Sequence, residues 1–209
     1  MRIFLTTVMF AALLTACGQA SAPPAPQLPG AAASEFVLSC TSFAALTPDA
    51  LAQRFGAENV VTQTLPGAEG ETYEATVVFP NDVTRRLVLV WNEARTAPAS
   101  VGIENAGTQW RGAEGYTIGT PIGEIERINV MPFKLWGFGW DYGGWVSDWS
   151  AGVLSQNPIC NTRIRFTPRG EPNTNAMGDR EFSSNEPAIR AADPIVSEFG
   201  LTIGAPSQQ

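Results

Sequence analysis

Two short segments with the start and stop signals of a helix are each followed by strand-like runs of apolar residues. The segments 47–56 and 120–129 both begin Thr-Pro, which offers a hydroxyl at the N-cap and a proline where its missing N–H costs nothing. Each carries an acidic residue early and an arginine late, which suits the helix dipole. Gly56 and Asn129 tolerate left-handed backbone and are expected to end the helices. If the shared Thr-Pro starts are a coincidence, the two halves will differ in topology.

Three strands are expected after each helix, so one order of elements occurs twice, over about 46–91 and 119–167. In the extension 168–204, alternating apolar residues predict a last strand over 195–203, and a short helix is expected near 186–192. The pattern predicts an α+β fold: two helix-plus-three-strand repeats that form one antiparallel sheet with short helices on one face. The expected strands are 59–65, 71–79 and 84–91, with a turn at Asn81 and Asp82, and then 130–142, 145–154 and 160–167.

The start of the chain has the pattern of an export signal. A short basic start precedes an apolar run over 3–14, which is shorter than the roughly 20 helical residues that cross a bilayer. The next residues, Leu14-Thr15-Ala16-Cys17, resemble the lipobox of bacterial lipoproteins. This resemblance implies a signal peptide over 1–16 and a mature chain that begins at a lipidated Cys17.

Residues 17–34 are rich in proline and alanine and have no apolar period, which is typical of a tether. We expect this tether to join the acylated cysteine to a single α+β domain over 35–204. The lipobox resemblance implies a membrane anchor made of acyl chains such as palmitate, because dual lipid signals give stable anchoring. Gly18 follows the cysteine where an aspartate would alter sorting, so resemblance to enterobacterial lipoproteins favours the outer membrane, facing the periplasm.

Two further cysteines, Cys40 and Cys160, remain after Cys17. An even pair in an exported protein predicts a disulfide, and only one pairing exists. The alternative is two free buried thiols. A redox-active cysteine is not expected, because the sequence has no CxxC motif and no histidine to lower a thiol pKa.

The composition limits the partners and the catalytic groups that the protein can use. The 209 residues include 13 Lys+Arg, 20 Asp+Glu and no histidine, for a formal net charge of −7. No nucleic-acid partner is expected, because neutralising phosphates needs a basic face. The lack of histidine removes the commonest general base and metal ligand. Walker, GxSxG and SxxK motifs are also lacking, so we assign no catalytic residue, no cofactor and no metal site.

Aromatic residues are concentrated between residues 135 and 149. Gly143 and Gly144 favour a two-residue hairpin turn, which would place Phe138 opposite Trp149. The other strand face would then carry glycines and suit the close approach of a helix. Strand alternation would put six aromatic residues on one side of this hairpin: Trp136, Phe138, Trp140, Tyr142, Trp145 and Trp149.

This aromatic side is either core or a contact surface for protein or sugar rings. We predict a mixture, in which Phe138 and Trp149 are buried while Trp140, Tyr142 and Trp145 are partly exposed near the turn. The candidate binding residues are therefore Trp136, Trp140, Asp141, Tyr142 and Trp145.

The arrangement of repeats resembles the folds of small periplasmic lipoproteins of the SmpA/OmlA type and of the β-lactamase-inhibitor protein. The stretch 132–144 also resembles the signature of an uncharacterised exported family. We expect a non-catalytic, lipid-anchored binding module for a protein or a glycan. The alternatives are a structural or assembly lipoprotein of the outer membrane, and a hydrolase that uses carboxylates such as Asp141 and Asp148.

Overall fold

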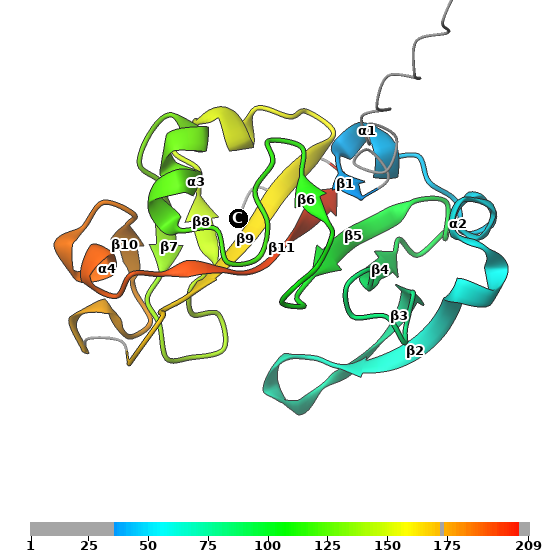
Figure 1. Cartoon of the computed structure of the whole chain (residues 1–209), viewed down its shortest axis with the longest axis horizontal. Helices are drawn as coiled ribbons and strands as arrows, with labels where there is room; N and C mark the ends of the chain where they lie inside the picture. Colours follow the sequence, from blue (N-terminus) through cyan, green and yellow to red (C-terminus); the bar gives the residue numbers. More distant parts are fainter. Residues whose placement is uncertain (1–35, 172–173, 205–209) are drawn as a thin grey trace, which may run out of the picture.

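A six-stranded antiparallel sheet is the largest element of the computed structural model, which describes residues 36–171 and 174–204 (Figure 1). Its strands lie in the order β2-β3-β4-β5-β11-β9, so the last strand of the chain pairs with β5 in the interior of the sheet. The expected α+β class, with antiparallel strands and short helices, is confirmed. The strands of this sheet are β2 (Val60–Pro66), β3 (Thr72–Val78), β4 (Leu87–Trp91), β5 (Pro98–Ile103), β9 (Cys160–Thr167) and β11 (Ile195–Ile203).

Two smaller sheets complete the strand pairing. Strands β10, β7 and β8 form an antiparallel sheet, and an antiparallel bridge between Trp145, just before β8, and Arg165 of β9 links it to the large sheet. Strands β1 and β6 pair in parallel. Their bounds are β1 (Val37–Leu38), β6 (Arg111–Gly112), β7 (Lys134–Trp136), β8 (Val146–Asp148) and β10 (Glu181–Ser183).

The two predicted helices begin each repeat. The Thr47 hydroxyl caps the first as expected, and Gly56 follows its end with a φ of +83°. The second begins one residue later than predicted, because Pro121 takes the N-cap position while the Thr120 hydroxyl accepts the backbone N–H of Thr117. The helices are α1 (Cys40–Phe43), α2 (Pro48–Phe55), α3 (Ile122–Asn129) and α4 (Pro187–Ala191), the last within the stretch where a short helix was expected.

The end of α3 also differs from the prediction. Val130, not Asn129, adopts the left-handed conformation, with a φ of +69°. The Asn129 side chain is fully buried, and it forms three hydrogen bonds with backbone groups. Its amide donates to the carbonyl oxygens of Met131 and Trp149, both at 3.0 Å, and accepts the backbone N–H of Leu154 at 3.1 Å.

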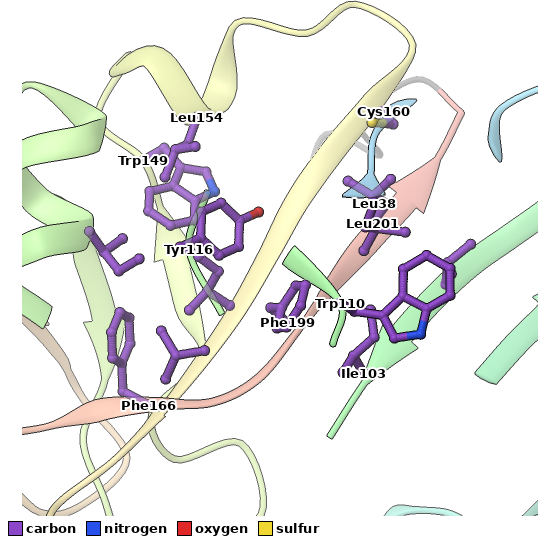
Figure 2. Packing of buried hydrophobic residues seen from close by; sticks show 14 of the residues in the cluster. Leu38, Ile103, Trp110, Tyr116, Trp149, Leu154, Cys160, Phe166, Phe199 and Leu201 are labelled. Atoms are coloured by element: carbon purple, nitrogen blue, oxygen red, sulfur yellow. The ribbon is translucent and has the colours of Figure 1, made fainter. Parts of the chain in front are cut away.

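One hydrophobic core lies between a face of the large sheet and the helices. Leu51 and Phe55 reach it from α2, and Ile122 and Ile125 from α3. The regular alternation of the strands places their apolar residues on this side. The sheet contributes Val78, Leu87, Leu89, Val101, Ile103, Ile164, Phe166, Phe199 and Leu201, several of which are drawn in Figure 2.

Trp110, which lies between β5 and β6 and is labelled in Figure 2, is fully buried and packs against three phenylalanine rings. Its ring centroid lies 5.3 Å from that of Phe36 and 6.1 Å from those of Phe43 and Phe55. Its indole N–H donates to the carbonyl oxygen of Arg85 at 2.8 Å. Trp110 thus joins the N-terminal helices to the β3–β4 connection.

The predicted disulfide is confirmed. Cys40, the first residue of α1, is bonded to Cys160, the first residue of β9, and their Cα atoms are 5.8 Å apart. The bond joins the beginning of the described chain to a strand of the second repeat, across a sequence separation of 120. The predicted lipidated Cys17, the signal peptide and the tether lie outside the described residues.

The first repeat follows its predicted pattern with one addition. Strands β2, β3 and β4 coincide with the three expected stretches to within a few residues, and Asp82 lies in the connection between β3 and β4. Strand β5, at 98–103, was not predicted. Its sequence PASVGI is poor in β-branched and aromatic residues, so its strand conformation depends on pairing with β4 and β11.

The second repeat is less regular. The expected strands 130–142 and 145–154 are reduced to β7 and β8, which have three residues each. Strands β9 and β11 match the predictions 160–167 and 195–203. Strand β10, from the extension after β9, pairs with β7 and completes the small sheet.

Gly143 and Gly144 do lie at the centre of a tight turn, because the backbone N–H of Trp145 donates to the carbonyl oxygen of Tyr142 at 3.3 Å, but the hairpin register predicted from this turn is wrong. Leu135 pairs with Val146, and residues 137–144 form a loop, which we call the aromatic loop. Phe138 bridges to Met177 and does not face Trp149.

The reason for this correction is a long-range contact at the glycines. A side-chain carbon on Gly137 would lie 2.5 Å from the carbonyl oxygen of Gly178, so only glycine admits the neighbouring segment 176–180. The backbone N–H of Phe138 donates to the carbonyl oxygen of Ala176 at 2.9 Å. The glycine side was expected to receive a helix, and it receives this extended segment.

Candidate binding surface

The two faces of the large sheet differ in chemistry. On β11, Phe199 points into the core, while Glu198 lies on the opposite face. On β9, Ile164 is in the core, while Arg163 and Arg165 lie on the opposite face. We call this second face the open face. It consists of Val88, Val90, Ser100, Gly102, Arg163, Arg165, Glu198 and Gly200.

Small residues form the floor of the open face. Gly200 pairs with Gly102 on one side and with Arg163 on the other. A side-chain carbon on Gly200 would lie 2.2 Å from the carbonyl oxygen of Val101, whereas one on Gly102 would meet open space. The open face therefore has a depression at Gly102, and side chains of the neighbouring strands surround it.

A small cavity of about 70 Å³ lies over this floor, and we call it the sheet hollow. Tyr73 of β3 lines one side, and Glu104, Arg163 and Glu198 line it as well. The bottom of the sheet hollow is formed by residues of β4 and β5. These are Val88, Val90, Ser100 and Gly102.

A larger groove of about 720 Å³ is also lined by Glu198, and we call it the Trp140 groove. Trp140 lines it from the aromatic loop, and Arg165 from β9. Ser197 and Thr167 add hydroxyl groups. Because Glu198 lines both spaces, the sheet hollow and the Trp140 groove border the same carboxylate.

The electrostatics of the open face depend on Glu198. Burial raises the pKa of this carboxyl group, Arg163 and Arg165 lower it, and Glu104 raises it further, with a net upward shift. Within the described ranges, no hydrogen-bond donor and no basic group within 4 Å pairs with the Glu198 carboxylate. Burial, then the charges of Glu104 and Glu198, also raise the pKa of Tyr73. The face thus holds a half-buried carboxyl group whose oxygens have no partner in the described part of the chain.

Arg165 fixes the aromatic loop to the sheet. Its guanidinium donates to the carbonyl oxygens of Gly143 and Asp141, at 2.9 and 3.0 Å. The backbone N–H of Phe166 donates to the carbonyl oxygen of Gly144 at 2.8 Å. Gly144 has a φ of +81°, and a side-chain carbon there would lie 2.0 Å from the carbonyl oxygen of Phe166. Glycine is required at this contact for both reasons.

Three of the predicted binding residues form a cluster. The rings of Trp136 and Trp140 are 5.8 Å apart, and those of Trp140 and Tyr142 are 5.4 Å apart, each pair edge to face. Tyr142 is 49% exposed, and the two tryptophans are half-buried. The indole N–H of Trp140 donates to the carbonyl oxygen of Gly137 at 2.9 Å, so only the ring remains for a partner.

Trp145 lies apart from this cluster, on the open face. It pairs with Arg165 in an antiparallel bridge, and the guanidinium of Arg163 lies 4.4 Å from its ring centroid. The side chain of Asp141 is exposed, and its carbonyl oxygen accepts a bond from Arg165. Trp145 and the cluster thus border the same groove-bearing surface from two directions.

The predicted mixture of burial is confirmed. Phe138 is 4% exposed and Trp149 is 8% exposed, whereas Trp140 and Trp145 are half-buried and Tyr142 is exposed. The six aromatic residues do not share one side, however. Trp149 packs against Phe133 in the core, with ring centroids 5.0 Å apart.

Sequence reasoning missed Arg163, Arg165, Glu198 and Tyr73. The alternation in β9, where Arg163 and Arg165 alternate with Ile164 and Phe166, was the available signal for a charged face. Glu198 alternates with Phe199 in the same way. Their convergence with Trp140 depends on strand order, because β9 and β11 pair across more than 30 residues.

Comparison with known proteins yields no match to a family model, to a curated protein or to a solved structure. The described helices include none that is long and apolar enough to cross a membrane. In the part of the chain that the structure describes, no group of three His, Cys, Asp or Glu residues is placed to hold a metal ion.

Proposed function

We propose that this chain is a non-catalytic, lipid-anchored protein of the bacterial envelope that binds a protein or a glycan through its open face and aromatic loop. The observation that carries the proposal is the Trp140 groove, where Trp140 of the aromatic cluster, the half-buried Arg165 and the Glu198 carboxylate meet. Its volume of about 720 Å³ lies in the range of roughly 300–1,000 Å³ that is typical of ligand pockets.

The chemistry of the surface supports binding. Aromatic and arginine side chains dominate the energetics of contact surfaces, because they bury large areas and also offer directional contacts. Trp140, Tyr142 and Trp145 are partly exposed; Trp140 lines the groove, Tyr142 packs against Trp140, and Trp145 pairs with Arg165, which also lines the groove. Arg165 holds the loop that carries two of them, so the surface is ordered before a partner arrives. Such preorganisation reduces the entropy cost of binding.

The lipid anchor and the envelope location rest on the lipobox at Cys17. If they are correct, intact-mass analysis of membrane-extracted protein will show a chain that starts at Cys17 and carries acyl groups. A soluble form that starts elsewhere would contradict the anchor and leave the binding proposal in place.

Paired substitutions test the binding surface. We expect Tyr142→Ala with Trp145→Ala to abolish partner binding and to change the free energy of unfolding by less than about 1 kcal/mol, because both side chains are partly exposed. The matched control is Val83→Ala, an exposed apolar residue on the β3–β4 connection. A loss of several kcal/mol in the paired variant would show that these residues are core, and the binding surface would then have to be sought in the segment 168–194.

Site-specific crosslinking tests where the partner lies. A photoreactive amino acid at Tyr142 should give adducts in intact cells, whereas the same group at Val83 should not. Analysis of the adduct for peptide and for sugar separates the two partner classes. Equal labelling from both positions would refute the proposed surface.

A further inference from the structure

The proposed function leaves the class of ligand open, and the Trp140 groove narrows it. We propose that this groove binds a short glycan chain, with a sugar ring against Trp140 and hydroxyl groups bonded to Glu198. This inference rests on the proposed function, and it is argued from the groups that the groove offers.

The first argument concerns Trp140. Because its indole N–H is already bonded to Gly137, the side chain offers a ring and no hydrogen-bond donor. Trp136 and Tyr142 pack edge to face against it and hold its orientation. An electron-rich ring held in this way attracts the polarised C–H groups on the flat side of a sugar.

The second argument concerns the acceptors. Glu198 is half-buried and, within the described ranges, its carboxylate accepts no hydrogen bond. Its oxygens are not among the fully buried side-chain atoms that lack a partner, so they reach solvent and are free to accept donors from a ligand. Sugar hydroxyls are such donors, and their bonds to a carboxylate are charge-assisted. Thr167 and Ser197, whose hydroxyl donates to the carbonyl oxygen of Arg165 at 3.3 Å, line the same groove.

The third argument concerns a peptide as the alternative occupant. A peptide that binds by adding a strand needs an unpaired strand edge. At the groove, β9 is paired with β11 on one side, and Phe166 is bonded to Gly144 on the other. The backbone at this position is therefore already paired, whereas the side-chain hydroxyls, carboxylate and ring suit a ligand rich in hydroxyls.

The fourth argument concerns room for a chain. The groove is bordered by Gly139, Gly143 and Gly170, and a side-chain carbon on Gly170 would meet open space. A ligand can thus approach the backbone closely at Gly170. The volume of about 720 Å³ suits a short oligosaccharide better than a single ring.

The test is a titration of the full-length protein with soluble tetrasaccharides of glucose and of N-acetylglucosamine, followed by tryptophan fluorescence and calorimetry. We expect at least one of them to bind and to shift the emission. Glu198→Gln should weaken that binding by about tenfold or more, which corresponds to one charge-assisted hydrogen bond. Glu93→Gln, at an exposed carboxylate of the β4–β5 connection that lines neither the sheet hollow nor the Trp140 groove, should change it by less than about twofold.

Trp140→Phe provides a second variant that keeps an aromatic ring, and circular dichroism checks that each variant is folded. We expect reduced affinity with Trp140→Phe and unchanged spectra. Failure of both tetrasaccharides to bind, or equal binding by Glu198→Gln, would overturn the glycan assignment. If a protein is nevertheless crosslinked at Tyr142 and lost in the paired variant, the open face remains a binding surface and only the ligand class is wrong.

Discussion

The two repeats begin alike and end differently. The first builds a continuous meander, β2-β3-β4-β5, whose strands pair with their neighbours in sequence. The second builds two strands of three residues and a loop of aromatic and glycine residues, and then places β9 in the large sheet, where β11 of the C-terminal extension pairs with it. The segment between β9 and β11 adds β10 and α4.

The difference shows which contacts set each register. In the first repeat, short turns such as that at Asp82 set the pairing of adjacent strands. In the second repeat, the loop 137–144 is held by Arg165 and by the segment 176–180, both distant in sequence. The regular repeat supplies a framework, and the irregular one carries the groove. Four experiments test this contrast.

The disulfide should have the largest effect, because it ties the N-terminal helix to the second repeat. Removing it with Cys40→Ser and Cys160→Ser should lower the free energy of unfolding by about 5 kcal/mol, as expected for closing a loop of this length. Denaturant unfolding of the oxidised protein and the double variant measures the change. A loss below about 1 kcal/mol would show that the halves are held together without the bond.

Among the polar residues of the second repeat, Asn129 should contribute most to the free energy of unfolding. Asn129→Ala leaves two carbonyl oxygens and the backbone N–H of Leu154 without their partner in a buried site. We expect a loss of about 2–3 kcal/mol. The control is Asn92→Ala, because Asn92 caps an exposed turn of the first repeat. A smaller loss at Asn129 than at Asn92 would contradict this ranking.

Val130 should be a site where stability increases. It is 76% exposed and has a φ of +69°, which is unfavourable for a β-branched residue. Val130→Gly should therefore stabilise the protein by roughly 0.5–1 kcal/mol, after the added entropy of the unfolded chain is counted. Thermal unfolding of Val130→Gly beside Val130→Ala measures this, since alanine retains the backbone strain. Equal melting temperatures would show that the left-handed geometry costs little.

Asp82 should report the turn of the first repeat by its titration. Hydrogen bonds from Thr84 and Arg85 lower the pKa of this carboxyl group from 3.8 to about 2. Because the folded pKa is lower than the ordinary value, the turn is stabilised above about pH 4, and this contribution is lost as the pH falls towards 2. NMR titration should find this low pKa, and Thr84→Val should raise it. A wild-type value near 3.8 would contradict the turn geometry.

The sequence by itself determined the elements whose signals are local. The cap at Thr47, the ends of β9 and β11 and the pairing of Cys40 with Cys160 follow from side chains close in sequence or from a single available partner. The mixture of buried and exposed aromatic residues agrees with the prediction, but the contacts that bury Phe138 and Trp149 are with Met177 and Phe133 and not across the predicted hairpin.

Tertiary structure alone decided the rest. β5 is a strand because β4 and β11 pair with it, although its own residues favour strands weakly. Gly143 and Gly144 form a tight turn, but this turn packs against Phe166 of β9 and does not set the register of β7 and β8. Glu198 and Trp140 meet only because β11 returns to pair with β9. Local chemistry selects a small set of conformations, and the order in which distant strands pair selects among them and assembles the groove.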